Sequence, residues 1–166
     1  MMTRTELLDR VGRLKTAKLE QASARHKPLL LLYAIGRLIR GDARGVAFAV
    51  VEEELGPLLA SPLGVGHKTD VALPFWHLQN DGLWEVRGAK NLRWRFDGKR
   101  PLTSELRRKN VTGRLPSRTA ELLRRDSVVA RAVVSELLTA YWGKRDIPKV
   151  VAALGFEAAK MAANSP

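Results

Sequence analysis

The positions of the apolar residues predict helices over most of the chain. Leu7, Val11 and Leu14 recur at the spacing of one helical face, and the run 29–35 is apolar almost all round, as in a helix enclosed by others. Pro28 suits the first turn of that second helix, where the N–H that proline lacks would have no partner. We therefore expect a mainly α single domain built on an enclosed central helix.

Three further helices are predicted beyond it. One covers 46–60, with the acidic run 52–54 facing solvent, although Gly56-Pro57 should kink this helix or end it early. Residues 127–142 form a clearly amphipathic helix, and a last helix begins at Asp146. No internal repeat is visible, so the helices belong to one packed unit.

The stretch from 72 to 96 differs from the rest because it holds three of the four tryptophans. Pro74 starts a short helix, and the spacing of Phe75 and Leu78 lets both point to the core. The outward side of this helix is then left to Leu73, Pro74 and His77.

A small antiparallel β-ribbon is expected to follow. Residues 83–86 look extended, and 92–96 alternate with period two. The alternation predicts an inward set, Leu92, Trp94 and Phe96, and an outward set, Arg93 and Arg95. Either the ribbon caps the core and carries arginines for solubility, or it lies against a phosphate backbone with Lys99 and Arg100 just beyond it.

The composition limits the chemistry. The 166 residues, 45 % of them hydrophobic, can bury one core, so we expect one domain over 1–158 and a tail or truncation point at 159–166. Cysteine is absent, and the histidines are scattered, so neither a metal site nor a cofactor is expected. No apolar run reaches the roughly 20 residues of a membrane span, and the N-terminus lacks a secretory signal, which favours a soluble, cytoplasmic protein.

Positive charge is concentrated in one part of the chain. The net charge is +12, and residues 86–125 hold thirteen Lys and Arg against three acids, or +10. A solvated surface would spread its charge more evenly, whereas clustered arginine suits phosphate. Arg107 and Arg108 belong to this tract. We therefore expect a nucleic-acid partner, in preference to an anionic membrane.

A second basic group precedes the central helix. Arg25, His26 and Lys27 put cations at a helix N-terminus, where the helix dipole disfavours positive charge by a few tenths of a kcal/mol on an exposed surface. The mismatch is either incidental or offset by an anion bound to the free N–H groups, and we favour the anion.

Catalytic patterns are missing. The paired histidines of an HNH nuclease are absent, and Asp81, Glu85 and Lys90 lie too close together for a PD-(D/E)xK site. We expect a binding module with no catalytic residues.

Three strings carry a resemblance to a known family: RHKPLLLLYAIGRL, LPFWHLQNDGLWEV and LLTAYWGKRDIPKVVAALGF. In this order and spacing, the chain from about Thr3 to Phe156 resembles the sulfur-binding domain of type IV, McrA-like restriction endonucleases. Those enzymes recognise phosphorothioated DNA and usually carry an HNH nuclease domain. The resemblance implies that this chain is either a cut-out domain or a stand-alone reader, with a nuclease domain or a second copy as further partners.

The resemblance also implies roles for particular residues. Leu73-Pro74-Phe75 matches the Tyr-Pro-Phe type motif at which the family's apolar pocket receives the sulfur, with leucine in place of tyrosine. His77 would form a wall of that pocket, and the Arg25 to Lys27 triplet would contact DNA near the modified linkage.

The sequence therefore predicts a mainly α domain with a small β-ribbon that binds phosphorothioated double-stranded DNA. The expected sulfur pocket is Leu73, Pro74 and His77. The expected DNA contacts are Arg25, His26, Lys27, Arg93, Arg95, Lys99, Arg100, Arg107 and Arg108. A winged-helix-like transcription regulator without sulfur preference is the alternative. An RNA-binding protein is a third class, less favoured because the aromatic residues occupy core-like positions.

Overall fold

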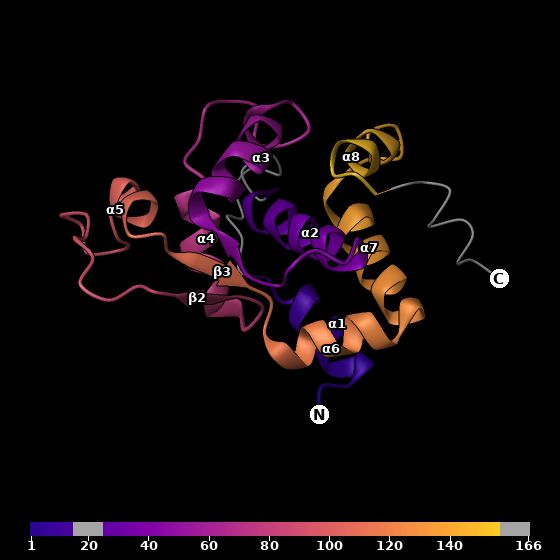
Figure 1. Ribbon diagram of the computed structural model, residues 1–166. Helices are drawn as coiled ribbons and strands as arrows, with labels where there is room; N and C mark the ends of the chain where they lie inside the picture. The colour runs from indigo at the N-terminus through magenta and orange to yellow at the C-terminus, as the bar shows by residue number, and fades with distance from the viewer. Residues whose placement is uncertain (15–24, 157–166) are drawn as a thin grey trace.

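The central helix is enclosed as predicted. A computed structural model describes residues 1–14 and 25–156, and in it α2 (His26–Ile39) lies in the middle of the molecule (Figure 1). Every residue of α2 from Pro28 to Gly36 is buried, and the helix contacts α3, α4, α6 and α7. Arg40 caps it and Gly41 follows with φ +83°, a conformation that glycine adopts without strain.

The other helices surround α2. They are α1 (Arg4–Gly12), α3 (Phe48–Ala60), α4 (Ala72–His77), α5 (Thr103–Arg108), α6 (Ser117–Arg125), α7 (Ser127–Tyr141) and α8 (Ile147–Ala153), with a 3₁₀ turn, η2 (Leu78–Asp81), directly after α4. In Figure 1, α7 and α8 lie on one side of α2, whereas α5 and the chain before it extend away on the other.

Several helix predictions are confirmed. Thr3 caps α1 by accepting the Glu6 N–H, and Leu7 and Val11 are buried. α7 covers almost the whole predicted range, with Asp126 as the capping side chain. The predicted tail, 159–166, lies outside the described residues.

One predicted helix starts later than expected and ends at the predicted residue. Val46–Ala47 is a strand, β1, and the helix begins at Phe48. Pro57 does not end it, and α3 continues to Ala60.

The predicted ribbon pairs differently from the expectation. β2 (Glu85–Arg87) pairs antiparallel with β3 (Thr112–Arg114), and β3 also pairs with β1, giving the order β1-β3-β2. Residues 92–96 do not form the second strand. Glycine is required at position 113, because a Cβ there would lie 2.2 Å from Cζ2 of the buried Trp84. This contact holds β3 against the core.

Aromatic rings fix α4 to the rest of the core. Phe75 meets Phe48 of α3 at a ring-centroid distance of 5.0 Å and Trp84 at 5.7 Å, both edge to face. With Phe75 and Leu78 fully buried, the inner face of α4 is anchored from both sides. Its outer face is thereby held in one orientation.

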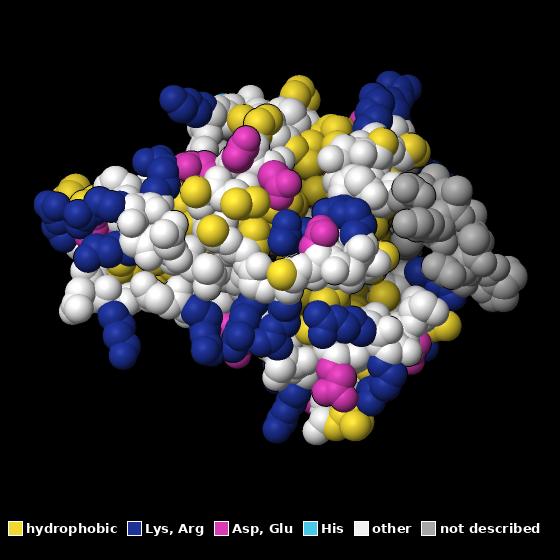
Figure 2. All heavy atoms as spheres, viewed as in Figure 1, with side chains coloured by type: hydrophobic (Ala, Val, Ile, Leu, Met, Phe, Trp, Pro, Cys, Tyr) yellow, Lys and Arg dark blue, Asp and Glu magenta, His cyan; other side chains and the backbone are white. Residues whose placement is uncertain are grey.

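Charge is unevenly distributed over the surface. Figure 2 shows Lys and Arg side chains gathered across the lower half of one face, in the region of β2, β3 and α6, and again at the left end of the molecule. Asp and Glu side chains lie mainly above them, in the region of α3. Within the described residues, no helix is long and apolar enough to cross a membrane.

Candidate nucleic-acid interface

The outward face of α4 contains Leu73, Trp76 and His77, which lie three and four positions apart. Asp70 starts the helix by accepting the Ala72 N–H through Oδ1 at 2.9 Å. Leu73 is 40 % exposed, an unusual position for a leucine, and His77 is partly buried. Two of the three residues predicted to face outward therefore do so.

Pro74 is a correction, since it is buried. On a helix, position 74 shares the inward stripe of Val71, Phe75 and Leu78, because these residues follow the i, i+3, i+4, i+7 pattern. All four are buried. The sequence-based assignment separated Pro74 from the pair 75 and 78, although 74 and 78 lie one turn apart.

Three cations from two other elements lie around His77. The pKa of His77 is lowered from its ordinary value, first by burial and then by the positive charges of Lys27, Arg100 and Lys99. The imidazole is therefore neutral at neutral pH. Lys27 at the start of α2 and Lys99 and Arg100 in the segment after Leu92 thus all lie near α4.

The anion expected at the start of α2 is supplied in part by the protein. Lys27 Nζ and Asp81 Oδ2 form an ion pair at 2.7 Å, with side chains only 12 % and 2 % exposed. His26 Nε2 lies 2.9 Å from the Thr69 hydroxyl. These contacts offset part of the dipole mismatch within the fold.

Arg25 is also engaged internally. Its guanidinium donates to the carbonyls of Tyr141 at 2.9 Å and of Pro62 and Gly64 at 3.3 Å, and it lies over the Trp142 ring at 5.3 Å. Arg25 therefore joins the start of α2 to the end of α7. DNA contacts by Arg25, His26 and Lys27 stay predictions.

A tight hairpin replaces the predicted second strand. Arg95 N–H donates to the Arg100 carbonyl at 2.9 Å, Leu102 N–H donates to the Arg93 carbonyl at 2.8 Å, and Trp94 and Pro101 form an isolated bridge. Gly98 turns the chain with φ +70°. We call residues 93–102 the tip hairpin.

The prediction that Trp94 and Phe96 face inward is wrong. Trp94 is 48 % exposed and Phe96 is fully exposed, whereas Leu92 is buried. The alternation along the chain is real, but no core lies beneath the segment after Leu92. An Asp-Gly dipeptide at 97–98 is a common turn signal that would have identified the hairpin.

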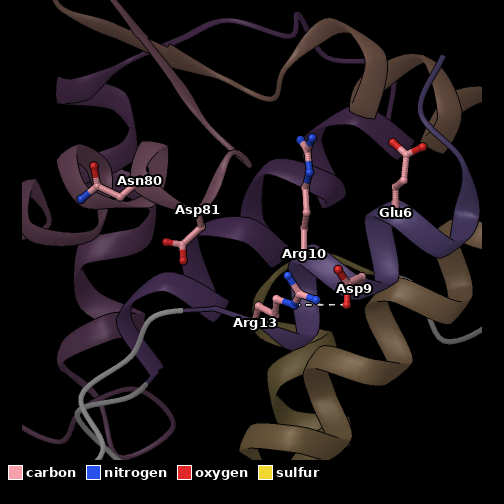
Figure 3. A pocket seen from close by; sticks show the side chains of 6 residues that line it. All are labelled: Glu6, Asp9, Arg10, Arg13, Asn80 and Asp81. Carbon is pink, nitrogen blue, oxygen red and sulfur yellow. Dashed lines mark ion pairs between the residues drawn. The ribbon is translucent and has the colours of Figure 1, made fainter.

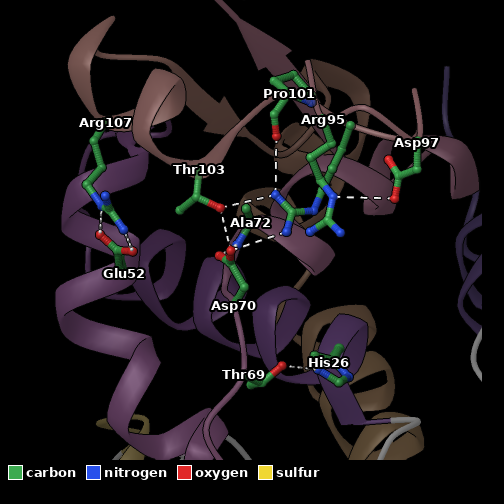
Figure 4. Close-up of polar contacts among 11 residues, drawn as sticks. His26, Glu52, Thr69, Asp70, Ala72, Arg95, Asp97, Pro101, Thr103 and Arg107 are labelled. Carbon is green, nitrogen blue, oxygen red and sulfur yellow. Dashed lines mark hydrogen bonds and ion pairs between the residues drawn. The ribbon is translucent and has the colours of Figure 1, made fainter. Parts of the chain in front are cut away.

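Arg100 anchors the tip hairpin. Its guanidinium is almost fully buried and donates to Asp70 Oδ2 at 3.2 Å, to the Thr103 hydroxyl at 3.1 Å and to the Pro101 carbonyl at 3.2 Å (Figure 4). The Thr103 hydroxyl also donates to Asp70. Burial raises the pKa of Asp70, but hydrogen bonds from Thr103, the Ala72 N–H and Arg100 outweigh it, so the net shift is downward. Arg100 is thus a structural residue and not an exposed contact.

The other predicted contacts are exposed, and several are paired. Arg107 makes a two-bond ion pair with Glu52 of α3, with N–O distances of 2.7 and 3.0 Å, so part of the acidic run is not simply solvated. Arg108 pairs with Glu105 at 3.0 Å and Arg95 with Asp97 at 3.4 Å. These pairs are solvent-exposed on the arginine side and are weak enough to exchange for phosphate.

Arg93 and Lys99 differ from these three. Both are exposed, and neither side chain forms a hydrogen bond or ion pair with the described part of the chain. The tip hairpin therefore presents two unpaired cations beside the exposed Phe96.

Two shallow depressions accompany this surface. One is lined by Glu6, Asp9, Arg10, Arg13, Asn80 and Asp81, between α1 and η2 (Figure 3). The other lies between α3 and residues 68–71 and is bordered by Glu52 and Arg107. Both are lined by charged and apolar groups together. Residues 1–14 and 25–156 contain no group of His, Cys, Asp or Glu arranged to hold a metal.

Comparisons with known proteins agree with this geometry. The family model for the ScoMcrA-like DNA sulfur-binding domain matches residues 4–159. A search of curated proteins gave no significant match.

Solved structures allow the shape of the chain to be compared. The sulfur binding domain of SprMcrA complexed with phosphorothioated DNA is 26 % identical, with 93 % of this chain and 95 % of that chain covered and a TM-score of 0.76. The corresponding domain of ScoMcrA is 24 % identical over 92 % and 96 % of the two chains, with a TM-score of 0.78. The type IV phosphorothioation-dependent restriction endonuclease ScoMcrA is 27 % identical, with 88 % of this chain but 31 % of that chain covered and a TM-score of 0.75.

Proposed function

Because the chain belongs to the family of ScoMcrA-like DNA sulfur-binding domains, we propose that it binds double-stranded DNA carrying an Rp phosphorothioate and holds the sulfur against the outer face of α4. The observation that carries the proposal is Leu73. It is an exposed apolar side chain on a helix whose neighbours, the start of α2 and the tip hairpin, are cationic.

The chemistry of the sulfur explains the apolar contact. Replacing a non-bridging phosphate oxygen by sulfur gives a larger, softer atom that accepts hydrogen bonds weakly. Pressing it against Leu73 loses little hydration, whereas an ordinary phosphate oxygen would lose water and gain no donor. An unpaired buried polar group costs about 1–3 kcal/mol, which corresponds to roughly tenfold to a few-hundredfold discrimination.

Selectivity and affinity then come from different residues. Leu73 and His77 form the sulfur contact, while Pro74 supports it from the buried side. The exposed cations Arg93, Arg95 and Lys99 neutralise phosphates on either side, together with Arg107 and Arg108 where their ion pairs exchange. The triplet Arg25, His26 and Lys27 sets the positive potential at the start of α2.

The experiment compares three duplexes of one sequence: all-oxygen, Rp-phosphorothioate and Sp-phosphorothioate. We expect the Rp duplex to bind at least tenfold more tightly than the other two in fluorescence anisotropy. Leu73→Asp should abolish this preference, because a carboxylate would face the thiophosphate. Leu73→Met, which keeps an apolar surface, should retain it. Equal affinity for all three duplexes would instead favour a general transcription regulator.

The context of the activity is a modification-dependent restriction enzyme. The matched family is a DNA-binding domain, and the matched part of the ScoMcrA endonuclease is about a third of that chain. We propose that the domain, residues 1–158, recognises modified DNA in the cytoplasm on behalf of a nuclease domain. A DNA-cleavage assay with the Rp duplex and added Mg²⁺ or Mn²⁺ should therefore give no cleavage by this chain alone.

A further inference from the structure

A second cationic surface lies on the outer face of the β-sheet. Opposite residues of an antiparallel pair project to the same side, as do residues two apart on one strand. The register pairs Glu85 with Arg114 and Arg87 with Thr112, so these four side chains share one face. Arg114 Nε donates to Glu85 at 2.9 Å, whereas the Arg87 side chain is exposed and forms no hydrogen bond or ion pair within the described residues.

Two arginines from neighbouring elements, Arg44 before β1 and Arg124 in α6, which follows β3, add positive charge near this face. Arg44, just before β1, is partly buried, and Arg124 is exposed in the last turn of α6. The pKa of Arg44 is lowered by burial and by the charges of Arg114, Arg124 and Arg87, while Glu85 acts in the opposite sense. We call these four arginines the sheet-side arginine cluster.

The cluster holds more positive charge than the protein neutralises. Glu85 is the one carboxylate among the charges that act on Arg44, and it is paired with Arg114. Arg44, Arg87 and Arg124 form no ion pair with the described part of the chain. Like charges held together, one of them partly desolvated, cost stability unless an external anion offsets them. The arrangement therefore fits a polyanionic ligand.

This surface is separate from the interface at α4. Lys27 lies at the beginning of α2 and Arg44 follows its end, and the 14 residues of α2 span about 21 Å. No histidine side chain is visible on the face in Figure 2 where the lower row of Lys and Arg side chains gathers. A phosphate bound beside His77 and Lys27 would therefore lie at the opposite end of α2 from Arg44.

We propose that the sheet-side arginine cluster binds the phosphate backbone of a second DNA segment, independently of sulfur and sequence, while α4 holds the modified linkage. The planar guanidinium matches two phosphate oxygens at once. Within the strands, the outer sheet face contains Glu85, Arg87, Thr112 and Arg114, and Ala47, paired with Thr112, adds only one methyl group, so the face lacks the large apolar centre of a protein–protein interface. The proposal rests on the proposed function for the identity of the ligand as DNA.

The test saturates the α4 interface first. Immobilised protein is loaded with a short Rp-phosphorothioate duplex, and a fluorescent unmodified duplex is then added at low salt. We expect the loaded wild-type protein to retain the second duplex. Arg87→Ala/Arg124→Ala should weaken that retention at least tenfold and lower its salt slope by about 2, and should leave the affinity for the Rp duplex unchanged.

The matched control removes the same charge elsewhere. Lys144 lies just before α8 and Lys149 in its first turn, and both are exposed. Because α8 is distant from the sheet in Figure 1, Lys144→Ala/Lys149→Ala should retain the second duplex. Equal losses in both double variants would indicate net charge alone and would overturn the proposal. The proposal would also be overturned if the loaded wild-type protein failed to retain the second duplex. Binding of poly-glutamate instead of the second duplex would overturn it too, because it would indicate an acidic protein partner.

The two proposals fail separately. Should the Rp duplex show no preference, the proposed function is wrong. The proposal for the cluster would still be supported if binding of the unmodified duplex depended on Arg87 and Arg124 and not on Leu73. It would be refuted if that binding did not depend on Arg87 and Arg124.

Discussion

Trp76 of α4 and Trp94 of the tip hairpin meet edge to face, with ring centroids 5.3 Å apart and an interplanar angle of 87°. Trp76 is partly buried and Trp94 is half exposed. This contact joins the helix that carries Leu73 to the hairpin that carries Phe96. The apolar contact for sulfur and the cations of the hairpin are therefore held in a fixed relation before DNA binds.

We expect Trp94→Ala to separate the hairpin from α4. An aromatic pair of this kind contributes about 0.5–1.5 kcal/mol beyond the area it buries. The free energy of unfolding should fall by about 1–2 kcal/mol in urea denaturation, and affinity for Rp duplex should fall severalfold. Trp94→Phe keeps an aromatic partner for Trp76 and should lose less of both. An alanine variant that binds like the wild type would mean that the hairpin needs no support from α4.

Phe96→Ala should leave the fold intact, because the ring is fully exposed and contributes nothing to the core. If the tip of the hairpin enters a DNA groove, the ring loses water on binding. Burying part of a phenylalanine side chain contributes about 1–2 kcal/mol, so affinity should fall roughly five- to thirtyfold for modified and unmodified duplexes alike. Thermal denaturation checks the first expectation and fluorescence anisotropy the second. An unchanged affinity would place the tip outside the interface.

Binding should strengthen as the pH falls. The pKa of His77 is lowered by burial and by Lys27, Arg100 and Lys99, so the free protein holds a neutral imidazole. A phosphorothioate beside it favours the charged form and raises that pKa, so binding takes up a proton. One proton gives at most a tenfold gain in affinity per pH unit, over the range between the lowered pKa of His77 in the free protein and its raised pKa in the complex.

Titrating affinity from neutral to mildly acidic pH measures this effect, with circular dichroism as the control for folding. His77→Gln should remove most of the pH dependence while filling a similar space. A pH dependence that persists in the variant would assign the proton to another group.

Asp70→Asn should destabilise the protein at neutral pH and much less in acid. The folded-state pKa of Asp70 is lowered, because the bonds from Thr103, the Ala72 N–H and Arg100 outweigh the opposing effect of burial. A carboxylate with a depressed pKa adds stability above its unfolded pKa of about 3.9, and this stability is lost as the pH falls through the folded value.

The expected loss at neutral pH is about 1–2 kcal/mol, the range for a hydrogen bond to a charged group in a partly exposed site. Urea denaturation of both proteins at pH 7 and in acid gives the comparison. Asp146→Asn, which alters a side chain that makes no capping hydrogen bond to α8, is the control. A constant difference between wild type and Asp70→Asn across the pH range would contradict the linkage.

The helices could be predicted from the sequence because their signals are local. The apolar run at the centre of α2 and the Thr3 cap of α1 each lie within a few residues of the structure that they specify. The pairing of β2 with β3 could not be predicted in this way. Their partner residues, such as Glu85 and Arg114, are 29 positions apart, and β3 contains the glycine that Trp84 requires, which reads as a weak strand.

The candidate site was predictable in type and less so in geometry. The excess of basic residues and the outward position of Leu73 and His77 followed from composition and helical spacing. The burial of Pro74 also follows from helical spacing, since position 74 shares the inward stripe of Val71, Phe75 and Leu78, but the prediction placed it outward. The burial of Arg100 does not follow in this way, because it depends on Asp70, which lies 30 positions away. Phe96 was misplaced because alternation indicates which residues share a face but not which face has a core beneath it.

The burial of Pro74 beside the exposed Leu73 separates the residues that maintain the fold from those that meet the ligand. Positions 73 and 77 lie on a surface whose inner support is complete without them. A library randomised at these two positions should therefore consist mostly of stable proteins that differ in the modified backbone they accept. Such a collection would be a source of readers for other chemically altered nucleic acids, such as selenium-substituted or methylated phosphate linkages.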